Sequence, residues 1–111
     1  MARPLRITYP GAYHHILSRG NTRASIFRED ADRKRFLVYL EEATRRYGIV
    51  VHAFCLMDNH YHLLVETSRP NISRAMQYVN TGYTAYFNAR HQRIGHLLQG
   101  RYKSIDRKSV V

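Results

Sequence analysis

The stretch IVVHAFCLMDNHYHLLVE, residues 49–66, decides the fold of this chain. Its first half, residues 49–57, is short, nearly all apolar and rich in valine, which predicts a buried strand. Asp58 and Asn59 follow, and both residue types form tight two-residue turns that tolerate positive φ. From His60 to Glu66 successive side chains alternate between two faces, as in a return strand. The stretch therefore predicts an antiparallel hairpin.

The segments around this hairpin predict a strand and a helix before it, and a helix and a strand after it. Residues 12–19 predict a strand that ends at a Gly-Asn turn. Carboxylates open a helix near residue 29, apolar residues recur through it at helical spacing, and Gly48 ends it. Beyond Pro70 a second helix begins near residues 71–73 and fades near residues 91–92. Residues 96–105 predict the last strand, and residues 106–111 a tail with no visible element.

This order of elements predicts an α+β fold of the ferredoxin-like split βαβ kind. Two helices would cover one face of a four-stranded antiparallel sheet. The chain has 111 residues, the length of one domain, and contains no internal repeat or low-complexity linker. We therefore expect a single domain over residues 1–111.

The composition excludes several classes of protein and favours a polyanionic partner. With 44% hydrophobic and 23% charged residues the chain is not of the disordered kind. No apolar run is long enough to span a membrane. The single cysteine, Cys55, excludes an internal disulfide framework and fits a cytoplasmic protein. The net charge is +10, and 15 of the 18 basic residues are arginine, whose planar fork matches phosphate oxygens. A nucleic acid is the usual partner of such a domain.

The residues most suggestive of chemistry are His60 and His62. In a strand, residues i and i+2 share a face with Cα atoms about 6.5 Å apart, so both imidazoles could approach one metal ion. Tyr61 and Leu63 would then face the core. A two-residue turn also pairs Cys55 with His62, although Cys55 by itself is typical of a small buried residue. The spacing leaves open a metal site, a zinc site that includes Cys55, and two half-exposed histidines without a ligand.

Five stretches together resemble a known family. They are GAYHHILSRGN (11–21), IF (26–27), AFCLMDNHYHLLVE (53–66), YFN (86–88) and GHLLQGRYKS (95–104). Their order and spacing resemble the single-tyrosine HUH transposases, in particular the branch that includes the REP-associated tyrosine transposases. The resemblance covers nearly the whole chain and implies the same ferredoxin-like fold. It also implies that His60 and His62 bind Mg²⁺ or Mn²⁺.

The activity that the resemblance implies is cleavage and rejoining of single-stranded or hairpin DNA in transposition. A tyrosine would attack a phosphodiester, leaving a 5′-phosphotyrosine link and a free 3′-OH. In the family this tyrosine lies on a further helix, after the segment that matches residues 100–104, and some relatives build the site between two subunits. The sequence up to Val111 shows no such helix, which indicates a truncated copy or a substitute residue. The substitutes are weak candidates: Tyr102, Tyr78 and Tyr86.

The basic residues predicted to contact DNA lie at strand ends or in loops. They are Arg19, Arg23, Arg90, Arg93, Arg101 and Lys103. Cationic grooves with aromatic platforms suit single-stranded nucleic acid. A solvated charged surface explains some of these residues equally well. The rival functions are a non-catalytic nucleic-acid-binding module of RNA-recognition-motif fold, and a zinc site formed by Cys55, His60 and His62. A homodimer is compatible with all of these.

Overall fold

A computed structural model gives the structure of the chain and describes residues 12–107. Its elements, in chain order, are β1 (Ala12–Arg19), the short 3₁₀ helix η1 (Asn21–Arg23), α1 (Asp30–Tyr47), β2 (Ile49–Leu56), β3 (His60–Thr67), α2 (Ile72–Arg90) and β4 (Lys103–Arg107).

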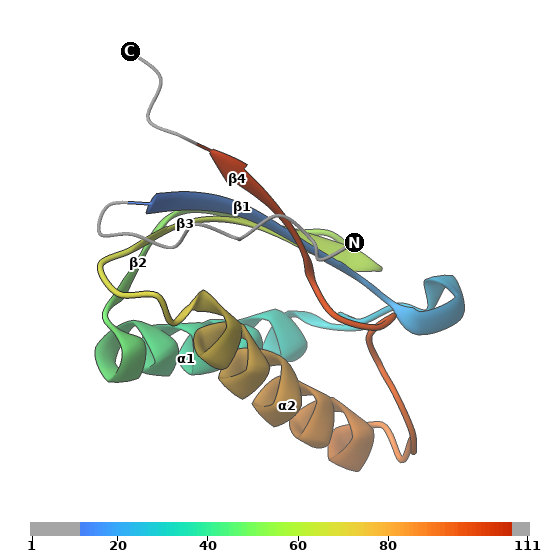
Figure 1. Cartoon of the computed structure of the whole chain (residues 1–111). Coiled ribbons are helices and arrows are strands. Elements are labelled where there is room, and N and C mark those ends of the chain that lie inside the picture. Colours follow the sequence, from blue (N-terminus) through green and yellow to red (C-terminus); the bar gives the residue numbers. More distant parts are fainter. Residues whose placement is uncertain (1–11, 108–111) are drawn as a thin grey trace.

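The four strands form one antiparallel sheet in the order β2-β3-β1-β4. The two helices pack against each other and lie on the same side of this sheet (Figure 1). This is the predicted ferredoxin-like α+β fold. Within residues 12–107, no helix lies on the opposite face of the sheet. None of the helices within residues 12–107 is long and apolar enough to cross a membrane.

Strand β3 separates the two faces of the sheet residue by residue. Tyr61, Leu63 and Val65 are at most 1% exposed and belong to the core between the sheet and the helices. His60, His62 and the residues that alternate with the core positions further along the strand are half-buried on the other side. The predicted alternation is therefore confirmed, and it directs both histidines away from the core. We call their side of the sheet the open face.

Helix α1 shows why local signals in the sequence were sufficient to predict where the helices begin and end. Its first turn carries Asp30 and Asp32, which complement the positive end of the helix dipole. Phe36, Leu40 and Ala43 form its buried stripe. Gly48 then adopts a left-handed φ of 68°, and its N–H donates to the Thr44 carbonyl at 3.0 Å. A side chain disfavours that conformation, so glycine suits the helix end.

The prediction that residues 49–57 form a buried strand is wrong in one respect. The strand exists as β2, but it lies at the edge of the sheet, where β3 is its one neighbour among the described strands. Val50, the partner of Glu66 on the open face, is 48% exposed. Phe54 is the partner of the buried Leu63, yet at this edge it is 53% exposed. A break in the register between Val51 and Ala53 also shifts the pairing with β3. Periodicity cannot tell an edge strand from a central one, because neighbours along the sheet come from distant residues. The following turn, Asp58-Asn59, has no positive φ.

The last strand also differs from its prediction. Residues 96–102 are mostly irregular, and β4 begins only at Lys103. In the irregular part Leu97 is fully buried, and Leu98 makes an isolated bridge to Gly20. Positive φ angles of 91° at Gly95 and 62° at Gly100 bend the chain on both sides of these leucines. Residues 106 and 107, predicted to lie in a tail, pair with β1 instead. The remainder of that predicted tail, residues 108–111, lies outside the described residues.

Candidate active site

The hairpin between β2 and β3 places His60 and His62 beside each other on the open face. The turn closes with a hydrogen bond from the Met57 N–H to the His60 carbonyl at 2.9 Å. The two imidazole rings are 5.1 Å apart between centroids, with their planes at 82°. Both side chains are half-buried. The arrangement brings two potential nitrogen ligands together at one pocket.

Each of these imidazoles has a polar neighbour on its Nδ1 atom. His60 Nδ1 lies 2.9 Å from the Asn59 side-chain oxygen. His62 Nδ1 lies 3.0 Å from Nε2 of His15, which belongs to the neighbouring strand β1. Burial lowers the pKa of His62, and the adjacent His60, His15 and Arg19 lower it further. The environment therefore favours a neutral His62 ring, the form that binds metals.

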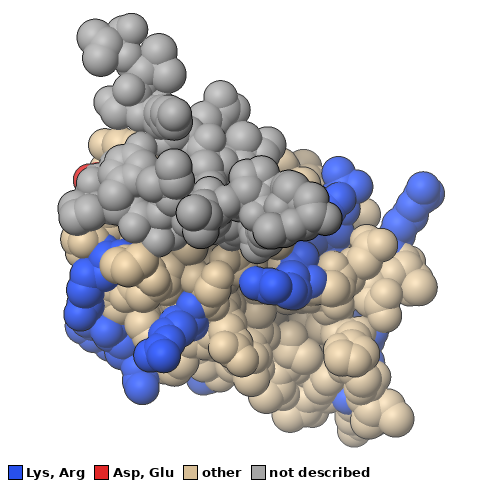
Figure 2. Space-filling view, viewed as in Figure 1, with Lys and Arg blue, Asp and Glu red and all other residues tan. Residues whose placement is uncertain are grey.

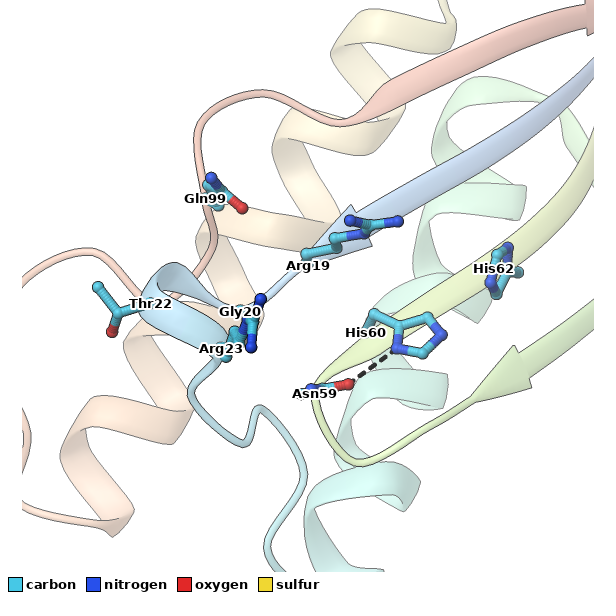
Figure 3. Close-up of a pocket in the computed structure, with 8 residues that line it drawn as sticks. All are labelled: Arg19, Gly20, Thr22, Arg23, Asn59, His60, His62 and Gln99. Carbon is cyan, nitrogen blue, oxygen red and sulfur yellow. Dashed lines mark hydrogen bonds between the residues drawn. The ribbon is translucent and has the colours of Figure 1, made fainter.

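A pocket of about 550 Å³ extends from the histidines toward η1 (Figure 3). Arg19, at the end of β1, is the register partner of His60 across the sheet. Arg23 follows on η1, where it and Thr22 have positive φ angles of 60° and 52°. Such angles are uncommon for residues with a side chain and often mark functional sites. The complete lining is Arg19, Gly20, Thr22, Arg23, Asn59, His60, His62 and Gln99.

Backbone hydrogen bonds hold the three segments of this pocket together. The Gly20 N–H donates to the Asn59 carbonyl, and the Gln99 N–H donates to the Arg19 carbonyl, each at 2.8 Å. A Cβ atom at Gly20 would lie 2.1 Å from the Ala24 carbonyl oxygen. Only glycine therefore fits where β1 enters η1, and this close turn brings Arg23 into the same pocket as Arg19.

The predicted DNA-contacting residues fall into two groups. Arg19 and Arg23 line the histidine pocket. Leu17 of β1 pairs with His62 on one side and with Lys103 on the other. Lys103 therefore lies on the open face together with the histidines. The other three positions lie apart from it: Arg90 is paired with Glu29, Arg93 donates to the His96 carbonyl at 2.8 Å, and Arg101 lines a second pocket beside α2.

Lysine and arginine side chains are spread over the face of the molecule seen in Figure 2, where little acidic surface is visible. This distribution matches the net charge of +10. Such a field attracts polyanions over several ångströms and weakens with added salt. The charge therefore supports attraction of a polyanion, and the pocket lining supplies the local contacts.

The candidate tyrosines lie on the helix side of the sheet, away from the histidines. Tyr78 donates to Glu42 at 2.7 Å, and this hydrogen bond raises its pKa. Burial raises the pKa of Tyr86, and the hydrogen bond that Tyr86 donates to Asp32 raises it further. Tyr102 packs against the core and lies 2.9 Å from the Ser73 hydroxyl. None of the three lines the histidine pocket.

Cys55 pairs with His62 across the hairpin, as the two-residue turn predicts. The expectation that Cys55 is buried is wrong, because its pairing with His62 places it on the open face, where the thiol is exposed. Its sulfur is 3.4 Å from that of Met57. Within residues 12–107 no group of three or more His, Cys, Asp or Glu side chains is placed to hold a metal ion.

Sequence reasoning misses two residues of the site. His15 and Asn59 each contact one of the paired histidines, and neither stands out from the pattern of the sequence. His15 lies in a recognisable strand, but its contact with His62 depends on the register between β1 and β3. Asn59 has the character of a turn former. Its position next to His60 in the chain is the one available signal.

The arrangement defines a class of site: an imidazole pair beside arginines, on the open face of a ferredoxin-like sheet, suited to binding a phosphodiester. Residues 8–109 match the family model described as "Transposase IS200 like". The chain therefore belongs to the IS200-like transposase family.

Solved structures share the fold. A REP-associated tyrosine transposase bound to a REP hairpin aligns with a TM-score of 0.73 at 12% identity, covering 99% of this chain and 64% of that one. A proposed transposase from Deinococcus radiodurans R1 aligns with a TM-score of 0.67 at 16% identity, covering 98% of this chain and 88% of that one. No curated protein matches the sequence. The chain thus spans 64% of the length of the hairpin-bound transposase, which is less than two thirds.

Proposed function

We propose that this chain is the DNA-binding and metal-binding part of a tyrosine transposase that acts on single-stranded, hairpin-bearing DNA. One observation carries the proposal: His60 and His62 share a pocket with Arg19 and Arg23 in a member of a transposase family. The relative that was solved with a REP hairpin supports the choice of ligand. Family membership also favours this function over an RNA-recognition-motif module, in which the paired histidines would have no purpose.

The arginines would bind the phosphates on either side of the cleaved bond. Arg19 is exposed beside His60, and Arg23 is exposed on η1, so a strand crossing the pocket would meet both cations. Charge-assisted hydrogen bonds from guanidinium groups to phosphate oxygens are among the stronger polar contacts in proteins. They would orient the scissile phosphate relative to the histidines.

The donor set fits a divalent metal ion with an incomplete protein shell. Two imidazoles suit Mn²⁺ or zinc better than Mg²⁺, and phosphate oxygens of the substrate could add the oxygen ligands that Mg²⁺ and Mn²⁺ prefer. His60 and His62 would hold the ion through ring nitrogens. When bound, the ion would supply Lewis-acid stabilisation of the charge that builds on the phosphate.

The nucleophile of the proposed reaction would be a tyrosine from outside residues 12–107. Among the tyrosines described, Tyr13 alone lies on the open face, and six residues along β1 separate it from the position of Arg19, about 20 Å. A further segment or a second subunit would therefore bring the tyrosine to the histidines. Its attack would form the 5′-phosphotyrosine link and release the 3′-OH.

A salt titration of DNA binding tests the proposal. Labelled hairpin-bearing single strands and random duplex of equal length would be titrated with the protein between about 50 and 200 mM salt, a range over which several phosphate contacts change affinity strongly. We expect tighter binding of the hairpin strand at every salt concentration. Equal affinity for both DNAs would contradict the proposed substrate.

A further inference from the structure

The hydrogen bonds on the Nδ1 atoms of His60 and His62 determine more than the orientation of the rings. A neutral imidazole carries one proton, so the nitrogen that donates a hydrogen bond leaves the other with a free lone pair. A metal ion can bind only the nitrogen with the free lone pair. The partner of each Nδ1 atom therefore decides which atom of each histidine faces a ligand.

For His60 the partner is a carbonyl-type oxygen. The side-chain oxygen of Asn59 accepts hydrogen bonds and cannot donate them, so at 2.9 Å the His60 Nδ1 must carry the proton (Figure 3). The Nε2 atom of His60 is then the one with the lone pair. Asn59 has no positive φ, so the turn itself tolerates other residues at this position.

For His62 the partner is the Nε2 atom of His15, at 3.0 Å. Their rings are 5.2 Å apart between centroids, and their planes are tilted by 32°. Leu17 is the register partner of His62, and His15 lies two residues before Leu17 on the same face, so the two histidines are diagonal neighbours. If His62 Nδ1 donates to His15, the Nε2 atom of His62 has the free lone pair, as in His60.

We propose that Asn59 and His15 are positioning residues that fix both His60 and His62 as Nδ1–H tautomers, so that each presents Nε2 to a metal ion. This inference rests on the proposed function of the histidine pair. Ligating histidines usually donate their other ring N–H to a neighbouring acceptor, and loss of such a partner typically costs about 10- to 100-fold in metal affinity. Here the acceptors are an amide oxygen and a third imidazole.

The test combines two measurements: the tautomers of His60 and His62 in the metal-free protein, and the affinity of the protein for Mn²⁺. Long-range ¹H–¹⁵N spectra at a pH where the rings are neutral distinguish Nδ1–H from Nε2–H tautomers. We expect Nδ1–H for both histidines in the unmodified chain. Asn59→Ala should shift His60 toward Nε2–H, and His15→Ala should do the same for His62. Mn²⁺ affinity by calorimetry should fall about tenfold or more in each variant.

Conservative variants separate positioning from a structural role. Asn59→Asp keeps an acceptor oxygen, and His15→Gln places an amide oxygen near the former Nε2 atom, so both should restore the Nδ1–H tautomers. The matched control is His52→Ala, which removes an exposed histidine from β2 that contacts Glu66 at 2.8 Å. It should leave both tautomers and the Mn²⁺ affinity unchanged.

The two measurements test different statements: the tautomers test the positioning role, and the Mn²⁺ affinity tests the metal site. Nε2–H tautomers in the unmodified chain, or tautomers that stay unchanged in Asn59→Ala and His15→Ala, would overturn the inference whatever the metal affinity. Nδ1–H tautomers that respond as expected would support the positioning role even in a chain that binds no Mn²⁺. That last combination would contradict the metal site in the proposed function.

Discussion

Arg19 on β1 and His60 on β3 are direct register partners at the end of the sheet where η1 begins. The pairing puts a permanent positive charge beside one of the two candidate metal ligands. A phosphate would be attracted by the arginine and by a metal ion on the histidines, so DNA binding and metal binding should be separable by substitution. The first two predictions use this separation.

Arg19→Ala should weaken binding of single-stranded DNA and lower its salt dependence. Loss of one phosphate contact reduces the slope of log K against log salt by about 1. Fluorescence anisotropy over a salt series measures the slope. The control is Arg45→Ala, which removes an exposed arginine from the end of α1, where it contacts Glu41 at 3.8 Å. A slope that falls equally in both variants would show that only net charge matters.

His60→Ala and His62→Ala should each weaken Mn²⁺ binding without changing the fold. Both side chains lie on the open face, so truncation leaves no cavity in the core. Calorimetry measures the affinity, and circular dichroism measures the fold and its thermal stability. Unchanged Mn²⁺ affinity in both variants would exclude the metal role of the pair.

The 111-residue chain by itself should bind DNA and form no phosphotyrosine adduct. Its candidate tyrosines are engaged on the helix side of the sheet, so none is positioned to attack a phosphate held at His60. Labelled single strands would be incubated with the protein and Mn²⁺, then separated on a denaturing gel. A covalent adduct on any tyrosine of the chain, located by mass spectrometry, would refute this expectation.

Asp32→Asn should destabilise the protein at neutral pH by about 1.5–3 kcal/mol, the range for hydrogen bonds to a charged group. Asp32 is fully buried and accepts hydrogen bonds from the Arg28 N–H, His91 and Tyr86 at 2.9–3.0 Å. Burial alone would raise its pKa, but these hydrogen bonds outweigh burial and hold the pKa below its usual value.

The pH dependence of this effect follows from the direction of the shift. The unfolded carboxyl has a pKa of about 3.9, so the stabilisation by Asp32 is complete above that pH. It is lost as the pH falls through the lower pKa of the folded state. Urea unfolding at pH 7, 5 and 3 should show the gap between Asp32→Asn and the unmodified chain shrinking at the lowest pH. A gap independent of pH would contradict the assigned charge.

Gly82→Ala should destabilise the protein by about 1–3 kcal/mol, as overpacking does. Helix propensity alone would favour alanine by about 1 kcal/mol. A Cβ atom at Gly82 would lie 2.7 Å from the ring of Tyr39, a residue of α1. Urea unfolding distinguishes the two effects, with Thr81→Ala as a control at an exposed position of the same helix. A gain in stability would show that Tyr39 moves aside without cost.

Local patterns in the sequence were sufficient to predict most of the fold. The alternation in β3 identified the core face and the open face, because side chains in any strand alternate. Helical spacing and end signals located α1 to within a residue or two. The i, i+2 spacing in the strand identified His60 and His62 as a pair on one face. The family resemblance, confirmed by the match over residues 8–109, then suggested a metal-binding role for them.

Relations between distant segments required the tertiary structure. The edge position of β2 and the late start of β4 both depend on which strands are neighbours. The contact between His15 and His62 joins residues 47 positions apart. Packing of the whole core sets that register, and a shift of one residue would turn His15 to the other face. The sequence by itself thus determined which residues are candidates for the chemistry, while only the folded sheet decided which residues hold them in place.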